Sequence, residues 1–162
     1  MRLGSEPRGY VDLALVGYEF PDAVATGSEW DWDANWLIVD GSVRETDGRA
    51  WRFSGADLTT WEVTELGRWL RGIRELEVSS ATSDATGRES RQLAFTEPSL
   101  GFNLIGRSND EVRIGIHLEF DARPPETDEA WGDFVVVVTM TASELDRAID
   151  DWALECAAWP KR

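Results

Sequence analysis

The sequence of 162 residues has few of the residues on which most catalytic and metal sites depend. Its one cysteine, Cys156, excludes an internal disulfide and a multi-cysteine zinc site. Its one histidine, His117, has no Gly-x-Ser-x-Gly, Walker or Gly-x-Gly-x-x-Gly motif to accompany it. We interpret Cys156 as a core residue and give His117 no catalytic role. These shortages favour a binding protein over an enzyme, and we expect no cofactor and no metal.

Long apolar runs and positive charge are also scarce. No stretch approaches the roughly 18 apolar residues of a membrane helix, and Met1–Arg8 lacks the apolar run of a signal peptide. We therefore expect a cytoplasmic protein. Sixteen basic residues stand against 31 acidic ones, for a net charge of −15. Such a balance argues against nucleic acid or an anionic membrane as a direct partner, because both prefer a basic face.

The acidic residues gather in two segments. From Gly9 to Val43 there are seven acids and no Arg or Lys, and this stretch also holds Trp30, Trp32 and Trp36. A second acidic segment runs from Asp121 to Asp133. Carboxylates beside large flat apolar side chains suit a docking patch for a basic protein. We predict that the partner-binding residues are Glu29, Trp30, Asp31, Trp32, Asp33, Glu126, Asp128 and Glu129.

Other interpretations of these segments stay open. The acids are also typical of solvated loops that confer solubility, and Trp30 and Trp32 would then be a loop lid on the core. Residues 31–35 imitate the start of a calcium loop, but Trp36 and Ser42 replace the glycine and glutamate that an EF-hand requires. Thirty-one acids also leave an enzyme or metal protein built on paired carboxylates as an alternative.

The hydrophobic patterns predict an α+β fold, with a disordered N-terminus over residues 1–8 and a single domain over residues 9–159. We expect a mainly antiparallel, meandering sheet of about seven strands, with two helices packed on it at about 59–74 and 142–157. Capping-box pairs mark both helix starts, Thr59 with Glu62 and Thr141 with Glu144. The expected strands cover residues 10–20, 35–44, 49–54, 91–96, 99–106, 111–120 and 131–140.

Three strand details follow from the alternation of apolar residues. The apolar parity changes around Val16–Gly17, which predicts a bulge. Residues 111–120 alternate strictly, which predicts one solvated face that carries His117. The run of four valines, 135–138, predicts burial on both faces of its strand.

Four local patterns together resemble the WapI-like immunity proteins, the partners of wall-associated and contact-dependent toxins. The resemblance spans roughly residues 10–157, and we carry no functional residue over from it. It is carried by Gly17-Tyr18-Glu19-Phe20-Pro21, Asn35-Trp36-Leu37-Ile38-Val39, Leu58-Thr59-Thr60-Trp61-Glu62-Val63 with Leu66, Trp69 and Leu70, and Phe95-Thr96-Glu97-Pro98-Ser99-Leu100-Gly101-Phe102.

This resemblance implies a small cytosolic protein that binds a toxin domain and blocks its active site. Toxins of this class are often nucleases with a basic cleft, which an acidic protein can occupy as a phosphate mimic. The main alternative is a binding domain of another kind, such as a small-molecule carrier with an apolar pocket. The sequence does not specify the toxin or the oligomeric state.

Overall fold

The computed structural model describes residues 1–27, 31–82, 90–108, 110–125 and 134–162, with residue 56 described by its backbone only. Their elements, in chain order, are β1 (Arg2–Gly4), β2 (Tyr10–Tyr18), α1 (Trp32–Asn35), β3 (Trp36–Arg44), β4 (Ala50–Thr59), α2 (Thr60–Arg74), β5 (Leu93–Ala94), β6 (Leu100–Arg107), β7 (Glu111–Leu118), the 3-10 helix η1 (Phe120–Ala122), β8 (Phe134–Thr141) and α3 (Ala142–Ala158).

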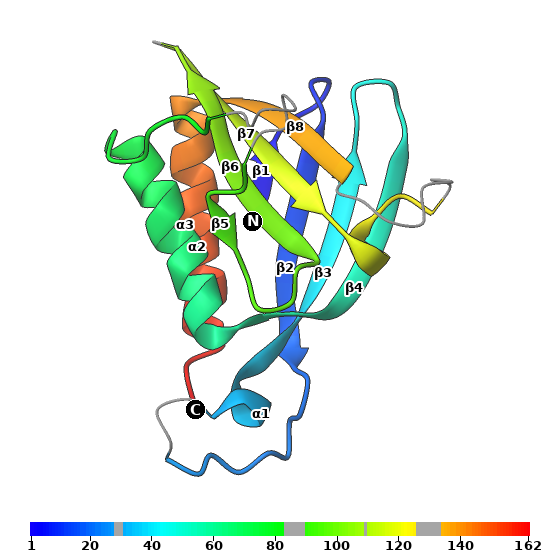
Figure 1. The fold of residues 1–162 in the computed structure, drawn as a ribbon, viewed down its shortest axis with the longest axis vertical. Helices are drawn as coiled ribbons and strands as arrows, with labels where there is room; N and C mark the ends of the chain where they lie inside the picture. Colours follow the sequence, from blue (N-terminus) through cyan, green and yellow to red (C-terminus); the bar gives the residue numbers. More distant parts are fainter. Residues whose placement is uncertain (28–30, 83–89, 109, 126–133) are drawn as a thin grey trace.

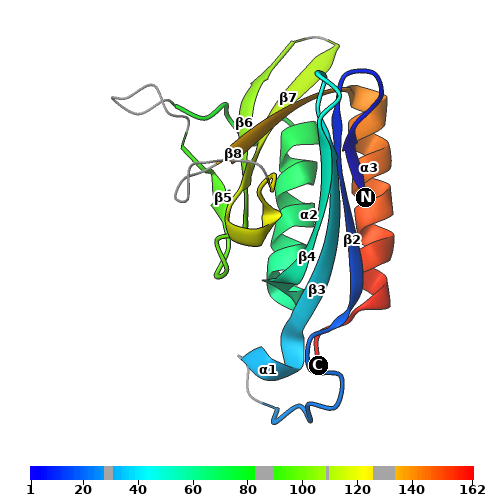
Figure 2. The same ribbon diagram turned by 90° about the vertical axis from the view of Figure 1, so that its right-hand side faces the viewer.

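The described strands form two antiparallel four-stranded sheets, ordered β1-β2-β3-β4 and β5-β6-β7-β8. The sheets face one another across a shared core, and the paired helices α2 and α3 close one side of it (Figures 1 and 2). The predicted α+β class, the antiparallel strands and the two packed helices are confirmed. The meander is divided into two sheets, however, because helix α2 lies between β4 and β5 and starts a second layer.

Both long helices begin where the capping boxes predicted. The Thr59 N–H and Oγ1 donate to Glu62 Oε2 at 2.8 Å each, and the Glu62 N–H donates back to Thr59 Oγ1 at 3.4 Å. Thr141 and Glu144 make the same reciprocal pair at the start of α3. Each box satisfies backbone donors that the first helical turn leaves without an intrahelical acceptor.

The N-terminus differs from our expectation. We expected residues 1–8 to be disordered, but β1 pairs with β2, with Leu3 opposite Val11. Met1 and Leu3 are buried in the core. The physical reason is that Met1 and Leu3 are two residues apart and so face the core from the same side of the chain. Two apolar residues among eight are too few to predict a strand.

The second face of each strand differs from prediction: β7 also buries His117, which we expected in solvent, and β8 is buried on one face only. We expected His117 on a solvated face, yet it is 1% exposed, and its Nε2 lies 2.7 Å from Asn103 Oδ1 on β6. We expected the valine run to be buried on both faces, yet Val135 and Val137 are exposed whereas Val136 and Val138 are buried. β7 is a central strand and β8 lies at the edge of its sheet, so position in the sheet overrides the local pattern. The predicted bulge in β2 is confirmed, since the register shifts between Leu15 and Gly17.

Candidate partner-binding surface

A segment between β2 and β3 projects beyond the ends of these strands, as both views show (Figures 1 and 2). We call its described residues, 19–27 and 31–36, the tip. At its base the Glu19 N–H donates to the Trp36 carbonyl oxygen at 3.0 Å, which joins the two ends of the segment. A turn follows, in which the Ala23 N–H donates to the Phe20 carbonyl oxygen at 3.1 Å. The segment has few apolar residues with a regular period, so it protrudes instead of adding to a sheet.

Three of the eight predicted partner-binding residues lie in the tip, namely Asp31, Trp32 and Asp33. The other five, Glu29, Trp30, Glu126, Asp128 and Glu129, lie outside the described residues. The structure therefore locates three of the five predicted residues of the first acidic segment. The part of the second acidic segment in the interface stays a prediction.

Trp32 combines the two roles that the sequence left open. Its ring meets Trp61 edge-on, with centroids 4.9 Å apart, and lies 6.1 Å from the ring of Trp36. The side chain nevertheless remains 40% exposed. Contacts with neighbouring rings restrict the indole on one side, and its free side is available to a partner. A large aromatic side chain that is already fixed loses little conformational entropy on binding.

Asp31 and Asp33 differ in their surroundings within the tip. Asp31 Oδ2 accepts hydrogen bonds from the Thr26 N–H at 2.6 Å and from Thr26 Oγ1 at 2.8 Å. These bonds, the backbone one first, hold the pKa of the Asp31 carboxyl below its usual value, so it is a charged group that also shapes the loop. Asp33 is exposed in the first turn of α1.

Apolar side chains are exposed beside these acids. Phe20 is 44% exposed and Val24 is 86% exposed. Glu19 and Asp22 are exposed in the same stretch of chain. The tip thus presents apolar groups among carboxylates, which is the composition expected of an interface with a basic protein.

Positive charge reaches the base of the tip from the other end of the chain. Arg162 places its guanidinium 3.5 Å from the ring centroid of Tyr18 and donates through Nη1 to the Pro21 carbonyl oxygen at 3.1 Å. The Arg162 N–H also donates to Asn35 Oδ1 at 2.9 Å. The segment that lacks Arg and Lys in sequence therefore has the guanidinium of Arg162 beside it in space.

An acidic hollow of about 270 Å³, which sequence reasoning missed, lies between the end of β4, the turn before β6 and η1. We call it the Asp57 hollow. Three carboxylates, Asp57, Glu97 and Asp121, contribute to its lining. Only a weak signal is available in the sequence, because Glu97 lies between two expected strands, 91–96 and 99–106.

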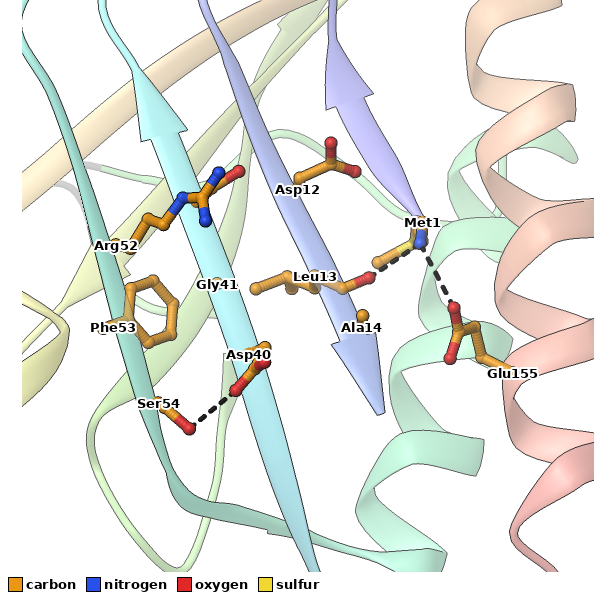
Figure 3. Close-up of a pocket in the computed structure, with 11 residues that line it drawn as sticks. Met1, Asp12, Leu13, Ala14, Asp40, Gly41, Arg52, Phe53, Ser54 and Glu155 are labelled. Atoms are coloured by element: carbon orange, nitrogen blue, oxygen red, sulfur yellow. Dashed lines mark hydrogen bonds and ion pairs between the residues drawn. The ribbon is translucent and has the colours of Figure 1, made fainter. Parts of the chain in front are cut away.

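A broader hollow of about 720 Å³ lies along β2, β3 and β4 (Figure 3). Several of its polar groups have partners: Asp40 Oδ1 accepts from Ser54 Oγ at 2.6 Å, and Asp12 forms an ion pair with Arg2 at 2.6 Å. The amino group of Met1 donates to the Leu13 carbonyl oxygen at 2.7 Å. No tryptophan lines this hollow. Its lining is mixed, with Leu13, Ala14 and Phe53 among the charged groups, and it lacks the indole-lined interior expected of a carrier.

The groups considered for chemistry have structural surroundings. His117 is buried against Asn103, and burial raises the pKa of the Cys156 thiol, which lies 3.7 Å from the Val63 carbonyl oxygen. A thiol with a raised pKa is a poor nucleophile. Within the described ranges, His, Cys, Asp and Glu side chains form no group of three or more suited to a metal ion. None of the described helices has the length and apolar content needed to cross a bilayer.

A protein-family model matches this chain. No curated protein sequence matches the chain. A family match covers residues 2–160, nearly the whole chain, and therefore includes both sheets, both long helices and the tip. The family's description implies a toxin-neutralising binding protein. The chain belongs to the immunity protein WapI-like family.

Proposed function

We propose that this protein is a non-catalytic cytoplasmic immunity protein that neutralises a cognate toxin domain by covering a basic surface on it. The observation that carries the proposal is the half-exposed Trp32, held by Trp36 and Trp61 among exposed carboxylates. A fixed aromatic anchor surrounded by charge is typical of residues that dominate binding energy. A nuclease toxin suits this surface best, because its cleft binds phosphate and is basic.

Net charge supports the same mechanism over longer distances. A protein of net charge −15 attracts a basic partner before contact, which raises the association rate at low salt. Salt screens this attraction, with a Debye length of about 10 Å at 0.1 M and 3 Å at 1 M. The affinity for a basic toxin should therefore fall as salt rises.

The small-molecule carrier receives less support. Such a protein needs a concave apolar site that covers most of its ligand. In the hollow along β2, β3 and β4, the charged side chains of Asp12, Asp40, Arg52 and Glu155 interrupt the apolar lining.

The test needs a candidate toxin domain, and the gene next to the one for this protein is the first place to search for it. Co-expression with wild-type protein should restore growth of cells that produce the toxin. The dissociation constant, measured by calorimetry at 50, 150 and 500 mM NaCl, should increase at each step. Replacement Trp32→Ala should raise it about 30-fold, the equivalent of about 2 kcal/mol.

A matched pair of charge variants separates local contact from net charge. Asp22→Asn with Asp33→Asn removes two exposed carboxylates from the tip, and Asp150→Asn with Asp151→Asn removes two from α3. We expect the first pair to weaken binding more than the second. Unrestored growth with wild-type protein would contradict the immunity function, whereas restored growth with equal effects of both pairs would contradict the role of the tip.

A further inference from the structure

The Asp57 hollow differs from other acidic sites on this protein because its carboxylates have no arginine or lysine among its lining residues. Elsewhere, Asp12 pairs with Arg2, Asp146 with Arg74, and Glu119 with Arg91. In the hollow, Glu97 and Asp121 are exposed and Asp57 is buried between them and the core.

The backbone of β4 is built so that Asp57 reaches this position. Leu37 pairs with Leu58 and Ile38 pairs with residue 56, so Asp57 is the extra residue of a β-bulge. A bulge redirects the side chain it carries. Gly55 leaves space for the redirected carboxylate, because a Cβ at Gly55 would lie 3.1 Å from Asp57 Oδ1.

The Asp57 carboxylate is an unsatisfied group. It is 6% exposed, and its Oδ2 has no hydrogen-bond partner. Burial raises the pKa of Asp57, a hydrogen bond from Ser99 opposes the rise, and the charges of Glu97 and Asp121 add to it. A buried carboxylate oxygen without a partner costs free energy that an incoming cation would recover.

Phe120 supplies an aromatic rim. It has a φ of 49°, in the left-handed region that a residue with a bulky side chain seldom adopts, and its side chain is 57% exposed. Such strain costs on the order of 1–3 kcal/mol and is kept where the surroundings require it. The result is an exposed ring beside three carboxylates, and a ring face attracts a cation within about 6 Å.

We infer that the Asp57 hollow receives one arginine side chain of the toxin partner, an inference that rests on the proposed function. A guanidinium offers five N–H donors in a planar fork, enough for Asp57 and a rim carboxylate together. The hollow's volume of about 270 Å³ is below the range of about 300–1,000 Å³ typical of small-molecule sites, and it suits a single side chain. Trp36 pairs with Thr59, two residues after Asp57, so the hollow and the tip lie at the same end of β4.

The hollow can be tested without a toxin. N-acetyl-L-arginine methylamide is titrated into the ¹⁵N-labelled protein, with the neutral citrulline compound as the control ligand. The arginine compound should shift the amide signals of Gly55, Ser99 and Ala122 with a dissociation constant in the millimolar range, and the citrulline compound should not. Asp57→Asn should abolish the shifts. Asp47→Asn, the same charge change in the turn between β3 and β4, should leave them unchanged, since Asn can still accept the Arg49 N–H.

The toxin complex then decides whether an arginine of the partner uses the hollow. Glu97→Gln and Asp121→Asn change exposed rim carboxylates, so both variants should fold, and each should raise the dissociation constant of the toxin about tenfold. Absent shifts, or equal shifts with the citrulline compound, would overturn the inference whatever the toxin does. Unchanged toxin affinity in both rim variants would overturn it and leave the proposed function intact. If the arginine compound shifts these signals but the protein neutralises no toxin, the hollow binds a guanidinium, and both the toxin partner and the proposed function are contradicted.

Discussion

The indole N–H of Trp152 donates to the Val63 carbonyl oxygen at 2.8 Å and joins α3 to α2 within the core. Trp152 is completely buried, and Gly67 permits its close approach, because a Cβ there would lie 3.2 Å from Trp152 Cδ1. Within the core, Trp152 thus joins the two helices by close packing and a directional bond, and the Arg74–Asp146 ion pair links them at the surface.

Trp152→Phe should reduce the free energy of unfolding by about 1–3 kcal/mol. The change removes the hydrogen bond and leaves a small void, and both effects destabilise a close-packed interior. Urea unfolding followed by circular dichroism should show a lower midpoint with an unchanged m-value. Leu154→Ala, at a position on the same helix that is 72% exposed, is the control and should have little effect. Equal midpoints for the two variants would contradict this role of Trp152.

Glu62→Ala should destabilise the protein by about 2–3 kcal/mol. Glu62 is 5% exposed, its Oε2 caps α2 through Thr59, and its Oε1 accepts the Thr96 N–H at 2.7 Å. Removal of the carboxylate leaves buried donors without an acceptor. Glu65→Ala, an exposed change on the same helix, should leave the urea midpoint almost unchanged. An equally small effect at Glu62 would mean that water replaces both contacts.

Local signals predicted the helices and the β2 bulge because their causes lie within a few residues. In each capping box the two partners are only three residues apart in the chain. The change in which alternate positions are apolar, at Gly17, is visible within one strand. The division into two sheets falls between β4 and β5, which are separated by α2 and belong to different sheets, and no local pattern marks that break. The burial of His117 depends on Asn103, 14 residues away, which no periodicity reveals.

The candidate site shows the same limit. Sequence singled out Trp32 by its neighbours, and its role in binding stays a prediction, although its ring is exposed. It missed Arg162, which reaches Tyr18 from the other end of the chain. It also missed Asp57, because the expected strand stopped at Ser54. Within β4 the apolar positions change from odd numbers, such as Phe53, to even numbers, such as Leu58. This bulge therefore has the same sequence signal as the bulge in β2.

Gly115→Ala should destabilise the protein by about 1–3 kcal/mol, because a Cβ there would lie 2.3 Å from Asn103 Oδ1. The clash would push Asn103 away from His117 and leave buried polar atoms unpaired. Gly106→Ala is a matched control on β6, since a Cβ there meets nothing within 4 Å. Alanine reduces the conformational entropy of the unfolded chain. The free energy of unfolding of Gly106→Ala should therefore be unchanged or higher by about 0.4–1 kcal/mol. Thermal or urea unfolding that ranks the two variants in the opposite order would refute the steric argument.

Glu144 should make stability depend on acid pH. Hydrogen bonds from Ser5 and from the Thr141 N–H, assisted by the charge of Arg8, lower the pKa of Glu144 from 4.5 to about 2. A carboxyl whose pKa is lower in the folded than in the unfolded state stabilises the fold above the unfolded value of 4.5. This contribution should decline as pH falls from about 5 to about 2.

The matching experiment compares wild type with Glu144→Gln by urea unfolding at pH 7, 4, 3 and 2. Wild type should be more stable at pH 7 by about 1–2 kcal/mol. This difference is less than the pKa shift alone would give, because solvent screens a side chain that is 21% exposed. The two curves should converge as pH approaches 2, where Glu144 itself becomes protonated. Glu65→Gln should follow wild type throughout, because that exposed carboxyl lies in α2, away from the α3 capping box. A constant gap between wild type and Glu144→Gln from pH 7 to pH 2 would mean that Glu144 acts through packing and not through its charge.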